Sequence, residues 1–276
     1  MQKNSIKAVT FDLWETLLFE RDGSNLQRTL ARCRNLAGAL TNLGIQTSPE
    51  QVDVALKGVI SSILKVWEKD KDVSHLDQLR LIVEAVSHGT AVIKDEWIDE
   101  LSTAFVSPIF EVRPYLNPHA RNVLESLQRR RKSMALICNT GLTPGIVLRK
   151  LLAEEGVAEY FDLMLFSDEV GIRKPDPAIF HLAANTLKME PTEMVHVGDN
   201  LKTDVWGAKK AGFKAIHFHC EEGHDKIAEA DPNSLVSISR RLGGLETERI
   251  FADKTVSSLT DVARIIEGLD LVTNEN

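Results

Sequence analysis

Strand-like and helix-like segments alternate from Asn117 to the end of the sequence, and this alternation limits the folds that the chain can adopt. The short apolar runs are IKAVTF near the N-terminus and MALIC, FDLMLFS, MVHVG, KAIHF and KTVSSL later on. Between them lie stretches in which apolar residues recur every three or four positions. Nearly uninterrupted apolar strands are typical of a sheet that is covered on both faces. The pattern predicts an α/β fold with a Rossmann-like, doubly wound parallel sheet and right-handed crossovers. Residues 221–250 fit no simple element.

The region from about Ser24 to Phe110 contains no strand-like run and shows helical spacing only. Its clearest helix start is SPEQ (Ser48–Gln51), where serine can cap the helix, proline can take the first position and glutamine follows three residues after the cap. A helical block between two parts of an α/β pattern predicts an inserted domain. The predicted division is an α/β core of residues 1–20 and 112–276 and an all-helical domain of residues 21–111.

Composition narrows the classes of protein to which the chain can belong. The net charge of −7 argues against nucleic acid or an anionic membrane as the main partner. No apolar run reaches the roughly 18 residues of a membrane-spanning helix, and the N-terminus lacks the apolar core of a signal peptide. Cys33, Cys138 and Cys220 are odd in number and have no CxxC spacing, as expected of thiols in a reducing compartment. We expect a cytoplasmic protein, monomeric or homodimeric, that binds neither nucleic acid nor membrane.

Polar residues follow the ends of several predicted strands. In an open α/β sheet, ligands bind beyond the carboxyl ends of the strands, so we expect these residues to converge on one edge. Carboxylates that lie together repel one another unless a cation lies among them, and oxygen ligands without a histidine or thiolate cluster favour Mg²⁺. A lysine beside a metal and an acid suits phosphate, and a carboxylate can act as a nucleophile. In chain order the residues are Asp12, Cys138, Asn139, Thr140, Lys174, Asp199 and Asp204.

The same residues lie in segments that resemble the four motifs of the haloacid dehalogenase (HAD) superfamily of aspartate-nucleophile hydrolases. The segments are FDLWETL, LICNTG, RKPDPAIF and VGDNLKTDVWGA; they occur in the order of the family and cover both ends of the chain. PYLNPHA and SDEVGIRKPDP also resemble the branch with a helical cap inserted just after the first motif (C1 type), which is where the helical block lies. The resemblance implies a phosphatase-like hydrolase whose substrate is a small phosphorylated metabolite.

The resemblance also implies a role for each matching residue. Asp12 is expected to attack phosphorus and form an aspartyl-phosphate, and Lys174 to neutralise Asp12 and the phosphate. Mg²⁺ is expected on the Asp12 carboxylate, the backbone carbonyl of Trp14 and Asp199. Asp204 is expected to support the metal site or to orient Lys174. Backbone N–H groups near residues 13–15 and 139–141 are expected to bind phosphate oxygens. The side chains expected to assist are those of Thr16, Cys138, Asn139, Thr140 and Lys174.

Two residues depart from the pattern of the family's phosphatases. Those enzymes have an aspartate two residues after the nucleophile, which protonates the leaving group and then activates water, and this chain has Trp14 there. General acid–base catalysis contributes ~10²–10⁴-fold, so phosphate-ester turnover is expected to be slow. Cys138 stands where the family usually has serine or threonine, and a thiol is the poorer hydrogen-bond donor. Trp14 is expected either to fill a gap between cap and core or to form a pocket wall. Glu15 is the nearest candidate for a replacement acid, although we expect it to be solvated in a turn.

Two alternative functions remain beside phosphate hydrolysis. Metal-free 2-haloacid dehalogenases of the same superfamily also use the aspartate nucleophile and carry an aromatic residue two positions after it, but they usually lack the first acid of the fourth motif, which is Asp199 here. A phosphate-binding or regulatory protein with little turnover is the second alternative, and Trp14 supports it. The sequence therefore favours Mg²⁺-dependent hydrolysis of a small phosphate monoester through Asp12.

Overall fold

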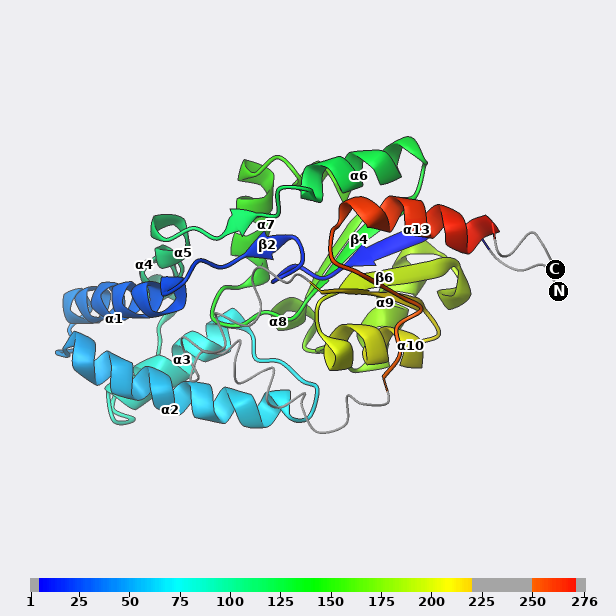
Figure 1. Cartoon of the computed structure of the whole chain (residues 1–276). Helices are drawn as coiled ribbons and strands as arrows, with labels where there is room; N and C mark the ends of the chain where they lie inside the picture. Colours follow the sequence, from blue (N-terminus) through cyan, green and yellow to red (C-terminus); the bar gives the residue numbers. More distant parts are fainter. Residues whose placement is uncertain (1–4, 220–249, 272–276) are drawn as a thin grey trace.

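The computed structural model describes residues 5–219 and 250–271, in which a parallel sheet lies beside a group of helices (Figure 1). Within these residues the sheet has six strands, and every neighbouring pair runs parallel. In spatial order they are β5 (Leu163–Phe166), β4 (Ser133–Cys138), β1 (Ala8–Phe11), β6 (Met194–Gly198), β7 (Lys214–Phe218) and β8 (Lys254–Val256). The predicted α/β fold is confirmed. The segment 221–250, for which no element was predicted, falls outside the described residues except at its last position.

Helices cover both faces of the sheet (Figure 1). One face is covered by α6 (Ala120–Arg129), α7 (Gly145–Glu154) and α13 (Thr260–Leu271), and the other by α9 (Pro177–Leu187) and α10 (Gly207–Lys210). Successive side chains of β1 alternate between the two faces, because Val9 and Phe11 belong to the first apolar cluster and Ala8 to the second. All of β1 is buried, which explains why its sequence shows no polar alternation. The shorter helical elements of this part are η2 (Ala158–Tyr160), α8 (Ser167–Val170), η3 (Pro191–Glu193) and η4 (Leu201–Trp206).

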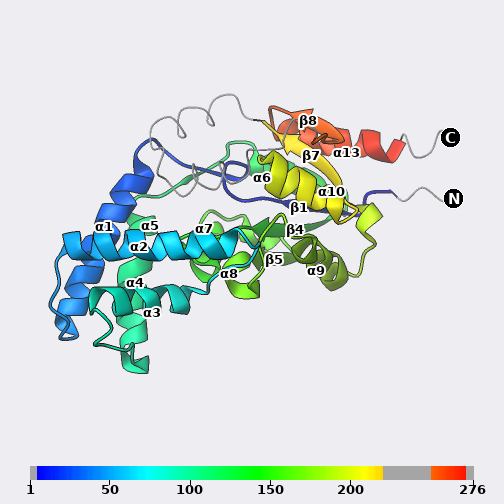
Figure 2. The same cartoon turned by 90° about the horizontal axis from the view of Figure 1, so that it is seen from below.

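The residues between β2 (Leu18–Phe19) and β3 (Tyr115–Leu116) form helices, which we call the helical cap. They are α1 (Ser24–Asn42), α2 (Pro49–Trp67), α3 (His75–Val86), η1 (Asp95–Trp97), α4 (Ile98–Val106) and α5 (Pro108–Glu111). The helical cap has its own apolar cluster and lies beside the carboxyl ends of the strands (Figure 2). The helix start at Ser48 is confirmed. The Ser48 hydroxyl accepts a hydrogen bond from the backbone N–H of Gln51, and the side-chain oxygen of Gln51 accepts one from the backbone N–H of Ser48. The domain boundaries at residues 20/21 and 111/112 stay a prediction.

Two local features differ from what the sequence predicted. A short antiparallel pair, β2 (Leu18–Phe19) and β3 (Tyr115–Leu116), lies where the chain leaves and re-enters the sheet domain, and two-residue strands are too short for a visible period. The expected regular helix after β6 begins instead as the π-helix η4, which the Asn200 side chain caps. π-Helical turns are frequent at functional sites. Within the described residues, no helix is long and apolar enough to cross a membrane.

Candidate active site

Three carboxylates and one lysine meet at the carboxyl ends of β1 and β6. The ammonium of Lys174 donates to Asp12 at 2.5 Å and to Asp204 at 2.6 Å, although Asp12 and Lys174 are 162 residues apart in sequence. One carboxylate oxygen from each of Asp12, Asp199 and Asp204 lies within 4.8 Å of the others. Asp12, Lys174 and Asp204 are all buried, and Asp199 is half-buried. The structure thus brings together the acids and the lysine that the sequence placed at strand ends.

A chain of hydrogen bonds fixes the orientation of Asp204. His196 Nε2 lies 3.2 Å from one of its oxygens, and the backbone N–H of Asn200 donates to the other at 2.9 Å. A carboxylate can only accept, so Nε2 carries the imidazole proton and Nδ1 accepts from the Thr10 hydroxyl, 2.8 Å away. A β-carbon at position 198 would lie 2.4 Å from the Asp204 carboxyl carbon, so Gly198 is required for this close approach.

Sequence reasoning missed Thr10 and His196, because both lie within strands rather than after them. The available signal was a polar residue inside each of two mostly apolar runs, Thr10 in IKAVTF and His196 in MVHVG. The two residues pair in register on the neighbouring strands β1 and β6. Buried polar groups in a sheet are normally bonded to each other, so the pair points to a polar network beneath the site.

Burial and charge shift the pKa values of the two carboxyls that share Lys174 in opposite directions. Burial raises the pKa of Asp12 to about 7, although the ammonium of Lys174 opposes this shift. Burial acts in the same way on Asp204, but Lys174 and the hydrogen bond from His196 hold its pKa below the usual range. Burial alone lowers the pKa of Lys174, yet Asp12 and Asp204 raise it above its usual value. Asp204 is therefore ionised in this site, whereas the charge of Asp12 is the more sensitive of the two to a ligand that binds there.

Asn139, after β4, holds the backbone of the segment that carries the lysine. Its side-chain amide donates to the Lys174 carbonyl at 2.8 Å and accepts from the Lys174 N–H at 2.8 Å. These two bonds connect the loop after β4 to the segment between α8 and α9. Asn139 was predicted to assist phosphate binding, and its side chain is occupied in positioning Lys174.

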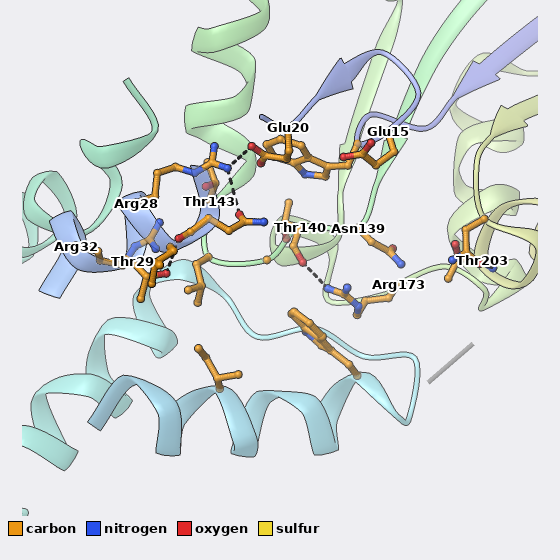
Figure 3. Close-up of a pocket in the computed structure, with 18 of the residues that line it drawn as sticks. Glu15, Glu20, Arg28, Thr29, Arg32, Asn139, Thr140, Thr143, Arg173 and Thr203 are labelled. Atoms are coloured by element: carbon orange, nitrogen blue, oxygen red, sulfur yellow. Dashed lines mark hydrogen bonds and ion pairs between the residues drawn. The ribbon is translucent and has the colours of Figure 1, made fainter. Parts of the chain in front are cut away.

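The residue before the lysine connects the sheet domain to the helical cap. The guanidinium of Arg173 pairs with Asp72, which follows α2, at 2.6 Å, and both side chains are almost fully buried. The same guanidinium lies 3.8 Å from the ring centre of Trp67 and donates to the Thr140 carbonyl at 2.7 Å. The other Asp72 oxygen accepts from the Trp67 indole N–H at 2.8 Å. We call this the Asp72–Arg173 contact; Figure 3 shows Arg173 beside Thr140.

A cavity of about 510 Å³ joins the acidic site to the helical cap (Figure 3). Its size is that of a pocket for a small organic molecule. Core residues that line it include Asp12, Trp14, Glu15, Lys174, Asp199 and Asp204. The cap contributes apolar and polar side chains of α1 and α2. The apolar ones are Leu26, Leu30, Leu56, Ile60 and Trp67, and the polar or charged ones are Asn25, Arg28, Thr29, Arg32, Asp53 and Lys57.

The structure corrects the expectations for three residues near the nucleophile. Thr16 and Cys138 are fully buried and do not line the cavity, so their side chains lie beneath its surface and not in the expected contact with phosphate. The Cys138 thiol packs in the apolar cluster between the sheet and α7. Glu15 is not solvated: it is 2% exposed, with a left-handed φ of 58° in the turn after β1. Trp14 packs against the same cluster and lines the cavity, so it forms a wall.

Together the sheet order and this site define a class of protein. The chain belongs to the haloacid dehalogenase-like hydrolase family, whose model matches residues 6–212. The family consists of hydrolases, which makes this protein a hydrolase.

Several similar proteins are named for a phosphatase activity. A glyceraldehyde 3-phosphate phosphatase of Pyrococcus furiosus is 31% identical over 230 residues, covering 82% of this chain and 84% of the relative. One of Methanopyrus kandleri is 27% identical over 252 residues, covering 86% and 98%. A phosphoserine phosphatase of Thermus thermophilus is 41% identical over 118 residues, and the match spans only 42% of this chain and 45% of that protein.

Solved structures share the fold across nearly the whole chain. A 2-haloacid dehalogenase from Pseudomonas syringae pv. Tomato superposes with a TM-score of 0.62 at 20% identity, covering 96% of this chain and 99% of the other. A HAD phosphatase from Thermococcus onnurineus superposes with a TM-score of 0.58 at 21% identity, covering 95% and 99%. Both comparisons concern the fold alone.

Proposed function

We propose that the protein is a Mg²⁺-dependent phosphatase that hydrolyses a small phosphate monoester through attack of Asp12 on phosphorus. The observation that carries this proposal is the buried Lys174 bridge between Asp12 and Asp204, with Asp199 beside it at one end of the cavity. Relatives that cover most of the chain are named as phosphatases, which supports the reaction class.

The residues present fit a magnesium ion. Three carboxylates and one ammonium leave two formal negative charges at the site, and the donors are hard oxygens, which suit Mg²⁺. Asp12, Asp199 and the backbone carbonyl of Trp14 would hold the ion, and Asp204 would orient Lys174. When bound, the ion supplies charge compensation and polarises a phosphoryl oxygen.

The chain's own groups suit the two chemical steps. An Asp12 oxygen would form a bond to phosphorus while the bond from phosphorus to the alcohol oxygen breaks, and the departing oxygen would take its proton from water. Water would then attack phosphorus, which releases phosphate and restores the Asp12 carboxylate. Lys174 lies 2.5 Å from Asp12 and would offset negative charge on the phosphoryl group throughout. The indole N–H of Trp14 is too weakly acidic to protonate a leaving group, so the first step would be slow for a poor leaving group.

One panel of assays tests the proposal. Phosphate release is measured from a range of phosphate monoesters, and halide release from 2-haloacids, with Mg²⁺ or with a chelator. Asp12→Asn should abolish phosphate release, and Asp99→Asn, which changes an exposed carboxylate of α4, should leave it unchanged. Phosphate release that needs both Mg²⁺ and Asp12 supports the proposal.

Two other results would overturn it in favour of a different function. Halide release without metal would identify a dehalogenase. Tight binding of phosphate with no ester turned over would identify a binding protein, as the tryptophan at position 14 allows.

A further inference from the structure

A buried arginine, Arg32, lines the cap side of the cavity. Arg32, on α1, is only 3% exposed and lines the same cavity as Asp12. Its Nε donates to the Phe105 carbonyl at 2.9 Å, and its guanidinium lies 4.8 Å from the centre of the Phe105 ring. Within residues 5–219 and 250–271, no carboxylate forms an ion pair with Arg32, and no acceptor bonds its two terminal amino groups.

The other cations of the cavity lining each have a carboxylate partner. Arg28 pairs with Glu20, and both side chains are buried. Lys57 pairs with Asp53 at 2.5 Å on the more exposed side of α2. The remaining pairs are the Asp72–Arg173 contact and the bridge from Lys174 to Asp12 and Asp204. Among the residues that the structure describes, Arg32 therefore leaves one uncompensated positive charge at the cap side.

The charge on Arg32 persists at neutral pH. Burial, with a smaller contribution from the nearby Arg28, lowers the pKa of Arg32 to about 10, which still leaves the guanidinium protonated at pH 7. Burying an ionised group without a partner is costly, because the protein replaces only part of its hydration. The contacts with the Phe105 carbonyl and ring offset some of this cost. The carbonyl accepts a bond from one of the five N–H donors of the Arg32 guanidinium. Packing α1 against α4 does not require the other four.

The position of Arg32 suits a ligand that contacts Arg32 at one end and Lys174 at the other. Figure 3 shows Arg28 and Arg32 on one side of the cavity and Asn139 and Thr203, which flank the acidic site, on the other. Apolar side chains of the cap, including Leu30, Leu56 and Ile60, line the same cavity. A molecule with an anionic group at each end and a short hydrocarbon spacer would match this distribution of charge.

We propose that Arg32 binds a carboxylate at the far end of the substrate, so that the enzyme acts on phosphate monoesters that carry a carboxylate. The inference rests on the proposed phosphatase function and adds the class of substrate. A carboxylate matches the single uncompensated charge, and it accepts two parallel bonds from a guanidinium. A second phosphate would bring up to two negative charges to a group with a single positive charge, and so fits less well.

Matched substrate pairs test the proposal. One member of each pair has a phosphate ester and a carboxylate joined by one to six methylenes, and the other has a hydroxymethyl group in place of the carboxylate. At the best length, kcat/KM should favour the carboxylate by about 10- to 100-fold, as expected of a hydrogen bond to a charged group. Arg32→Gln should abolish this preference through KM, with kcat for the hydroxymethyl substrates unchanged within about threefold.

Two variants separate binding from packing. Arg34→Gln removes the same charge from an exposed position of α1 and should keep the carboxylate preference. Arg32→Lys keeps a charge but cannot form two parallel bonds, and it should retain part of the preference. Equal losses on both members of each pair would mean that Arg32 acts only in packing, and would overturn the proposal. A stronger preference for a second phosphate than for a carboxylate would also overturn it.

A binding measurement makes the proposal independent of turnover. The carboxylate member should bind Asp12→Asn protein more tightly than the hydroxymethyl member in calorimetric titration, and the difference should vanish when Arg32→Gln is added. If no ester is hydrolysed in an Asp12-dependent way, the proposed function fails, while this titration still decides the role of Arg32. Equal affinity for the two ligands in the Asp12→Asn protein would refute the carboxylate site.

Discussion

At the scale of single residues, Trp14 affects the expected rate of the proposed reaction but not the position of its nucleophile. Its indole packs against the apolar cluster beside the sheet and forms part of the cavity wall. The phosphatases that the chain resembles have a proton-transferring aspartate at this position, and the N–H of an indole is too weakly acidic for that role. The proposed nucleophile and lysine are therefore in place in a site that lacks its usual acid.

We expect Trp14→Asp to raise kcat for phosphate esters by about 100-fold, the lower end of the usual effect of general acid catalysis. The gain should be largest for esters with poor leaving groups, because these need the proton most. Trp14→Asn is the matched control: it removes the same indole but offers no titratable proton. Steady-state kinetics on both variants measure the effect, and equal kcat values for the two would contradict the explanation.

The residues of the site differ in how far the sequence could predict them. Asp12, Lys174, Asp199 and Asp204 follow strands or begin helices, where the topology of a parallel sheet dictates convergence. His196 lies inside a strand, and its bond to Thr10 becomes visible only when β1 and β6 are paired. The burial of Cys138 and Glu15 depends on the rotation of the chain at a strand end, which apolar spacing does not encode.

At the scale of elements, sequence patterns predicted helices and strands better than the contacts between them. The cap helices follow from apolar spacing and, for α2, from its capping residues. The π-helix η4 depends on Asn200 capping its first turn, which a helical period cannot reveal. The Asp72–Arg173 contact joins the loop after α2 to the segment between α8 and α9, and neither residue stands out in its own segment.

We expect Asp72→Asn to destabilise the protein by about 3 kcal/mol and to lower kcat at least tenfold. An amide leaves the buried guanidinium of Arg173 without a charged partner, and breaking one side of a buried pair typically costs 3–5 kcal/mol. Arg173 directly precedes Lys174, so its displacement should also move the ammonium away from Asp12. Urea unfolding and steady-state kinetics measure the two effects.

Two controls show whether the pair itself is responsible. Asp77→Asn breaks an exposed pair with Arg80 on α3 and should cost less than about 1 kcal/mol. Adding Arg173→Met to Asp72→Asn should recover part of the lost stability, because it removes the unpaired charge. Strictly additive losses in this double variant would argue against the coupling.

At the scale of the whole molecule, the helical cap and the sheet domain have separate apolar clusters, and the cap cluster has its own source of pH sensitivity. Against this cluster lies His75, whose ring centre is 5.4 Å from that of Phe105 and whose Nε2 is 3.2 Å from the Ser102 hydroxyl. Burial, followed by the charge of Arg32, lowers the pKa of His75 from 6.5 to about 4. His75 is therefore neutral in the folded protein at pH 5.5, although it would be mostly protonated in the unfolded chain.

Because the unfolded chain binds more protons than the folded protein between pH 6.5 and 4, the contribution of His75 to stability is complete above pH 6.5 and falls as the pH is lowered. We expect this contribution to the free energy of unfolding to fall by about 1 kcal/mol between pH 7.5 and pH 5.5. Other buried histidines, such as His196, shift in the same direction, so the test is a difference between variants. Urea unfolding at the two pH values should show that His75→Gln loses about 1 kcal/mol less than the wild-type protein, whereas His181→Gln, at an exposed position, loses as much as the wild type. A pH dependence of His75→Gln identical to that of the wild type would mean that His75 does not carry the linkage.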